Sequence, residues 1–129
     1  MPHWVEPTLD NIHQGLQQAN RNVEADPEGH LVVRGNEMNA LLLIEQEGIL
    51  KVRFLFHSTQ KTESMELLRA INEFNTTYVI VKAFWLDGLM MFDTDICISG
   101  GISIQSLLQT LSSMETILKN ATEIHSFLG

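Results

Sequence analysis

The spacing of apolar positions along the chain predicts three amphipathic helices. The first begins after Thr8, whose hydroxyl suits the N-cap position, and the second spans about residues 63–75. The third begins near Ser103, where Ile102 and Leu107 stand at the two ends of a hydrophobic staple. Each helix therefore offers one apolar side to a core.

Apolar runs bounded by turn residues predict five strands. Three of them lie at residues 30–34, 39–46 and 49–57, and Glu47-Gly48 supplies a tight turn between the last two. The third strand alternates clearly between its two faces, as a half-buried strand does. One of its faces carries Lys51, Arg53, Leu55 and His57.

Asp87-Gly88, which stands between two apolar runs, predicts a two-residue hairpin that joins the last two strands. If Leu86 pairs with Leu89, then Trp85 faces Met90 and Lys82 faces Asp93. Opposite charges in that position are mildly favourable. A slip of one residue would lose this match and mix the faces, so the pattern favours this register.

The predicted order of elements is α-β-β-β-α-β-β-α. Hairpins, and loops that pass through a helix, join its strands, which indicates an antiparallel sheet packed by helices. We therefore expect a single α+β domain over residues 1–129.

Charge and composition argue against several classes of partner. The formal net charge is −8, from 16 acidic and 8 basic residues, and the basic residues are scattered. Nucleic acids and anionic membranes both favour clustered positive charge, so we expect neither as a partner. The first ten residues lack the pattern of a signal peptide, and the single cysteine, Cys97, excludes an intramolecular disulfide. We expect a cytoplasmic protein.

The region from helix 63–75 to the last helix resembles the YbjN family of bacterial sensory transduction regulators. The matching residues are Ile71-Asn72, Asn75, Val81-Lys82-Ala83-Phe84 and Gly101-Ile102-Ser103. The resemblance is close over about half the chain and rests on structural motifs. It implies a fold similar to that of type III secretion chaperones, which are small, acidic, dimeric proteins that hold extended segments of other proteins. It implies no catalytic residues.

Asp93-Thr94-Asp95 is similar to the D-x-D motif of phosphohydrolases, in which one carboxylate attacks and both help to hold Mg²⁺. That motif usually continues with Thr or Val where Cys97 stands. The competing interpretation is a pair of polar side chains on the outer face of a strand. The histidines show no metal-binding spacing. We therefore expect no catalytic, cofactor or metal site.

One face of the predicted hairpin is more apolar than a solvated sheet face should be. We predict a protein interface there, and on the second strand Leu42 and Ile44 are expected to join Leu55 on the equivalent face. The alternative is that helix 63–75 or the segment around Trp4 covers this face. The predicted contact residues are Tyr78, Ile80, Phe84 and Met91.

These observations predict a non-enzymatic, protein-binding regulator or chaperone-like protein that forms a homodimer. Two other classes stay open. One is a magnesium-dependent phosphatase that uses Asp93 and Asp95, and the other is a small-ligand sensor domain.

Overall fold

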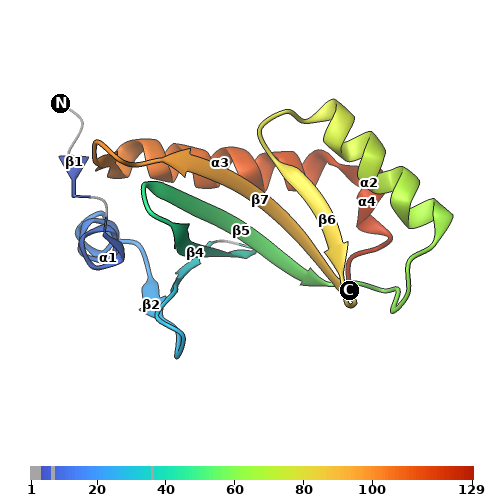
Figure 1. Cartoon of the computed structure of the whole chain (residues 1–129), viewed down its shortest axis with the longest axis horizontal. Helices are drawn as coiled ribbons and strands as arrows, with labels where there is room; N and C mark the ends of the chain where they lie inside the picture. The colour runs from blue at the N-terminus through green and yellow to red at the C-terminus, as the bar shows by residue number, and fades with distance from the viewer. Residues whose placement is uncertain (1–3, 7, 36) are drawn as a thin grey trace.

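The chain folds around a six-stranded antiparallel sheet, drawn in Figure 1 from a computed structural model that describes residues 4–6, 8–35 and 37–129. The strands lie side by side in the order β2 (Val23–Ala25), β3 (Leu31–Arg34), β4 (Asn39–Gln46), β5 (Ile49–His57), β7 (Leu89–Cys97) and β6 (Lys82–Leu86). A separate two-stranded sheet joins β1 (Trp4–Val5) to β8 (Ile102–Ser103). The prediction of an α+β fold with an antiparallel sheet is confirmed.

Helices cover one side of this sheet. They are α1 (Leu9–Gln18), α2 (Met65–Thr77), α3 (Ile104–Asn120) and the short α4 (Thr122–His125). In Figure 1, α3 runs behind the sheet, while α1 lies near β2 and α2 lies near β6. We call the side of the sheet that packs against α3 the inner sheet face, and the opposite side the outer sheet face.

Hydroxyl side chains cap the N-termini of the three long helices, which satisfies backbone N–H groups that lack a partner within the helix. The Thr8 Oγ1 accepts from the Asn11 N–H at 3.2 Å, and the Ser64 Oγ accepts from the Leu67 N–H at 3.1 Å. The Ser103 Oγ accepts from the Ser106 N–H at 3.3 Å, as the sequence predicts for the last helix.

The core lies between the inner sheet face and the helices. Phe92 of β7 is fully buried at its centre, and its ring centroid lies 5.3 Å from that of Phe74 and 5.7 Å from that of Phe56. Val52 and Leu50 of β5 are also fully buried. Because burial of such side chains contributes most of the favourable free energy of folding, this face anchors the sheet.

The β6–β7 hairpin has the predicted register. Leu86 pairs with Leu89, Trp85 with Met90 and Lys82 with Asp93. The turn requires positive φ at both of its central residues, and Asp87 and Gly88 have φ values of 50° and 82°. The local turn chemistry therefore sets the pairing of β6 with β7.

Besides the two-stranded β1–β8 sheet, three features differ from the prediction. The segment between α1 and β3, for which the sequence predicts no strand, contains β2, which adds a strand to the edge of the sheet. The last helix ends at Asn120, and α4 follows as a separate turn. The helix predicted to stop at Asn75 continues to Thr77, and Tyr78 is its C-cap residue.

Asn75 pairs with the exposed edge of the sheet. Its Oδ1 accepts from the Ala83 N–H at 2.7 Å, and its Nδ2 donates to the Ala83 carbonyl at 2.9 Å. One side-chain amide thus imitates a neighbouring strand at this position of β6. Satisfying the edge in this way protects it from pairing with other chains.

Candidate functional site

The outer sheet face is the candidate site, because none of the helices in the described part of the chain crosses it in Figure 1. Strand register places its members, since side chains alternate between the two faces. Leu42 and Val52 pair on the inner side, and their neighbours along each strand therefore point outward. The outer residues used below are Leu41, Leu43, Lys51, Arg53, Leu55, Lys82, Phe84, Leu86, Met91, Asp93 and Asp95.

An apolar row crosses three strands of this face. Met91 of β7 pairs with Leu55 of β5 on one side and with Phe84 of β6 on the other. Met91 is 5% exposed although it lies outside the core cluster, so its neighbours on the open face bury it. Leu55 is 43% exposed and the nearby Leu86 is 56% exposed. The row therefore offers apolar surface to solvent.

A partly buried ion pair lies directly beside this row. The Arg53 Nε and Nη2 donate to the two carboxylate oxygens of Asp93, each at 2.8 Å. The Arg53 Cζ also lies 5.6 Å from the centroid of the Phe84 ring. The hydrogen bond to Asp93 is the main cause that raises the pKa of Arg53, so the guanidinium stays charged.

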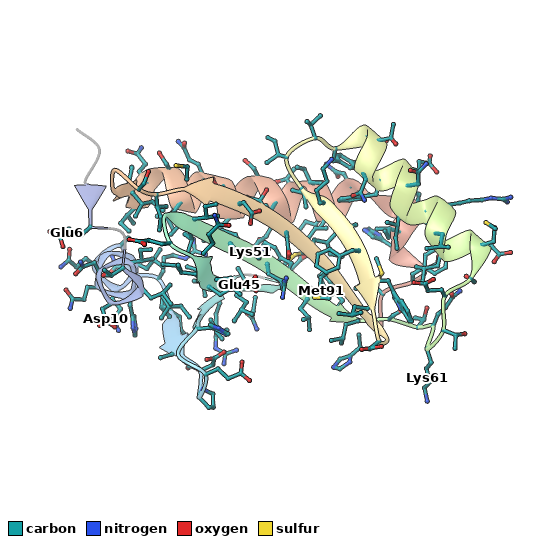
Figure 2. The ribbon with its side chains drawn as sticks, in the orientation of Figure 1. Glu6, Asp10, Glu45, Lys51, Lys61 and Met91 are labelled. Atoms are coloured by element: carbon teal, nitrogen blue, oxygen red, sulfur yellow. The ribbon has the colours of Figure 1, made fainter. Side chains whose placement is uncertain are left out.

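Lys51 extends the charged group toward the end of β7. Its Nζ lies 3.8 Å from Asp93 Oδ2, 3.8 Å from Asp95 Oδ1 and 3.9 Å from Glu45 Oε2. Asp95 and Glu45 are each 58% exposed at the side chain, whereas Asp93 is 10% exposed. Figure 2 labels Glu45, Lys51 and Met91 over these strands. The face thus combines apolar area with paired charges of both signs.

Lys82 does not complete the ion pair that its position suggests. Its backbone lies opposite Asp93 as predicted, but its Nζ donates to the carbonyl of Asn75 at 3.4 Å. The Asp93 carboxylate turns toward β5, where a guanidinium offers two donors in the right geometry.

The structure separates the four predicted contact residues. Phe84 and Met91 are neighbours on the outer sheet face. Tyr78 is instead half-buried against the core, with its ring 4.8 Å from that of Phe74. Ile80 is 70% exposed, but it precedes β6 and borders a hollow along α3 on the helical side. The alternation of faces fails here because the chain bends before β6 begins at Lys82.

The expectation for the second strand is also wrong. Leu42 is fully buried in the core, and Ile44 packs against the same core from the edge. Leu41 and Leu43 occupy the outer sheet face, opposite Arg53 and Lys51. The run 41–44 is apolar throughout, so it shows no alternation that would indicate which side chains point inward.

Neither predicted cover lies over this face within the described residues. The segment with Trp4 pairs as β1 with β8, and α2 packs against β6 and α4. The two ends of the apolar row, Leu55 and Phe84, therefore face solvent in the single chain.

The Asp93-Thr94-Asp95 motif lacks the geometry of a phosphatase site. Both Asp93 oxygens accept from Arg53, and the Thr94 hydroxyl donates to the Ile80 carbonyl. A nucleophilic carboxylate that also holds Mg²⁺ needs oxygens open to the metal and to the substrate, whereas here the guanidinium is bound to both oxygens and carries the positive charge that a metal ion would bring. The motif belongs to the charged part of the outer sheet face.

One thiol and one set of possible metal ligands could also carry chemistry, but neither forms a site with other functional groups of the described residues. Cys97 is exposed, and hydrogen bonds with Ser99 lower the pKa of its thiol. Among the described residues, the group of three potential metal ligands is Asp26, Glu28 and His30, on the turn before β3. There Asp26 accepts the backbone N–H groups of the other two residues, which is ordinary turn structure.

The fold and the site define a small α+β protein with a sheet that helices cover on one side only. Residues 8–121 match the profile of the YbjN family, described as "Putative bacterial sensory transduction regulator". The chain therefore belongs to the YbjN family, whose description names a regulator.

A solved structure supports the fold. The chain is similar to the crystal structure of YbjN from E. coli, described as "a putative transcription regulator", with a TM-score of 0.75 and 14% sequence identity over 98% of this chain and 99% of that one. No curated protein is significantly similar in sequence. Within the described residues, no helix is long and apolar enough to cross a membrane.

Proposed function

We propose that this member of the YbjN family is a non-enzymatic, cytoplasmic regulator that acts by binding protein through its outer sheet face. The single observation that carries the proposal is the row of Leu55, Met91 and Phe84 on a sheet side without helices. A sheet face that only meets water is mostly polar, whereas contiguous apolar area usually marks an interaction site.

The ion pair beside the row supports the same proposal. Arg53 and Asp93 are 18% and 10% exposed at the side chain, so they already lie mostly out of water. Docking another protein here would remove little further hydration from them, and each already has its hydrogen-bond partner. Polar groups that are satisfied before binding favour an interface, because no donor or acceptor is stranded by it.

The phosphatase alternative makes a prediction that separates it from this proposal. If Asp93 were the nucleophile, the wild-type chain with Mg²⁺ would hydrolyse phosphate esters and Asp93→Asn would not. Because Arg53 holds both Asp93 oxygens, we expect no turnover by either protein. Turnover that Asp93→Asn abolishes would replace the binding proposal with an enzymatic one.

Site-specific photo-crosslinking tests the proposed function directly. A photoreactive amino acid placed at Leu55 samples the outer sheet face, and the same residue at Leu68 of α2 is a matched control, because both side chains are 43% exposed. In cells that make the protein, we expect discrete protein adducts from position 55 and few from position 68. Equal yields at the two positions, or adducts only at 68, would show that the outer sheet face is not the binding surface.

A further inference from the structure

The charges at the centre of the outer sheet face are sorted by strand, while Glu45 of β4 and Lys82 of β6 add one charge of each sign at its sides. The cations Lys51 and Arg53 both stand on β5, and the anions Asp93 and Asp95 both stand on β7. The two sets are level with each other, since Lys51 pairs with Asp95 and Arg53 with Asp93. These four charges balance, while the whole chain carries a net charge of −8.

Such an arrangement is complementary to itself. Consider a two-fold axis that runs parallel to the strands, midway between β5 and β7 and just above the outer sheet face. This axis lays β5 of one copy over β7 of the other and keeps every residue at its own level along the strands. Lys51 then lies opposite Asp95 of the second copy, and Leu55 lies opposite Met91 of the second copy. Cations meet anions and apolar residues meet apolar residues, as an isologous interface requires.

The charge balance also favours a second copy over a basic partner. Two chains of net charge −8 repel each other over most of their surfaces, and the repulsion is least where the local charge is zero. A basic partner would be attracted most strongly to an acidic surface. The outer sheet face has balanced charge, so it does not favour such a partner. Face-to-face packing of two sheets is a common arrangement, with the strand directions within about 30° of each other.

We propose that a second copy of this chain docks on the outer sheet face about this axis, with Lys51 of each copy against Asp95 of the other. The proposal rests on the proposed function, because it names the protein that the same surface binds. Lys51 and Asp95 carry the specific contact, since their side chains are 23% and 58% exposed and both are therefore reachable.

Two single charge reversals and their mixture test the arrangement. Lys51→Glu leaves the reachable charges of this face negative, and Asp95→Lys leaves them positive. Each variant alone should associate at least about tenfold more weakly than the wild type, because like charges then oppose each other twice across the axis. An equimolar mixture should form a heterodimer, since the two altered faces complement each other. Sedimentation velocity over a concentration series measures all three samples.

The matched control uses an ion pair away from this face. Lys119 Nζ lies 3.5 Å from Glu37 Oε2, and both side chains are more exposed than Lys51. Lys119→Glu and Glu37→Lys change the net charge by the same amounts as the test variants. They should associate like the wild type, which shows that position on the outer sheet face matters and total charge does not. Circular dichroism melts establish that every variant is folded.

The outcomes separate this inference from the proposed function. If the wild-type chain stays monomeric throughout the concentration series, the proposal that a second copy binds to the outer sheet face is wrong. If position 55 still crosslinks other proteins in that case, the proposed function stands and only its partner changes. A wild-type dimer whose single reversals are not rescued by mixing overturns the two-fold arrangement. If Lys51→Glu fails to fold, the Asp95→Lys variant and the wild-type series still decide the case.

Discussion

The two faces of one sheet differ in what surrounds them. On the inner sheet face, Phe92 is fully buried between Phe74 of α2 and Phe56 of β5. On the outer sheet face, Met91 is 5% exposed although it lies outside the core cluster, and Leu55 beside it is 43% exposed. The inner face is held by packing, so it carries the stability of the fold. The outer face leaves apolar side-chain area exposed in the folded chain.

Charge distinguishes the same two faces. The inner sheet face places apolar side chains against the helices, whereas the outer face embeds Arg53 and Asp93 among apolar neighbours. A charged pair of this kind adds little net stability, because the cost of removing both ions from water offsets their attraction. Under the proposed function, the pair would serve to fix how a partner docks on this face. The comparison places the packed core on one side of the sheet, and on the other side it leaves the surface for which we propose binding.

The largest predicted effect is on the inner face. Phe92→Ala should lower the free energy of unfolding by about 3–5 kcal/mol, since it leaves a cavity between two aromatic rings. Phe84→Ala on the outer face should cost clearly less, because the half-buried ring has solvent on one side. Urea denaturation measures both. Equal losses would mean that both faces contribute alike to the core.

The next effect distinguishes a broken ion pair from a replaced one. Arg53→Met should cost about 2–3 kcal/mol, because Asp93 is left poorly solvated without its partner. The double variant Arg53→Met with Asp93→Leu should recover most of this loss, since it leaves no unpaired charge. Urea titrations of both variants give the values. A double variant as unstable as the single one would show that the pair itself stabilises the fold.

A smaller effect concerns the edge of the sheet. Asn75→Ala removes both hydrogen bonds to the Ala83 backbone and should cost about 1–2 kcal/mol. Asn72→Ala is the matched control on the exposed side of the same helix. Amide hydrogen exchange at Ala83 should accelerate only in the first variant. Unchanged protection there would mean that β6 does not depend on the Asn75 side chain.

The smallest effect is a change in reactivity at the end of β7. Hydrogen bonding with Ser99 lowers the pKa of the Cys97 thiol, so the thiolate forms at a lower pH than in a free cysteine. Ser99→Ala should shift the pH profile of alkylation by iodoacetamide to higher pH, with no change in stability. If the pH profile of alkylation does not move, the Ser99 hydroxyl is not what lowers the pKa of the Cys97 thiol.

Local signals allowed much of the fold to be predicted from the sequence. Asp87-Gly88 set the β6–β7 register because a two-residue turn fixes the pairing of the residues on either side. The caps at Thr8 and Ser103 could be predicted because a capping hydroxyl accepts from a backbone N–H only three residues ahead. The three-residue β2 was missed, since so short a segment shows no period of its own.

The candidate site was harder to predict because it depends on distant residues. Arg53 and Asp93 are 40 positions apart and meet only because β5 and β7 become neighbours with α2 and β6 between them in sequence. Tyr78 and Ile80 fall on the outer face only if the strand alternation extends back before β6 begins at Lys82, which it does not. The sequence therefore indicated a second apolar face and two of its residues, Phe84 and Met91, but not its charged centre.

The most direct measurement compares association with stability in Phe84→Asp. This variant places a charge in the apolar row, next to Met91, while the core on the other side of the sheet is unchanged. Sedimentation velocity should show association with itself or with a captured partner lost, and urea denaturation should show a change of less than about 1 kcal/mol in the free energy of unfolding. A variant that unfolds like Phe92→Ala, or one that associates as the wild type does, would contradict the assignment of this face to binding.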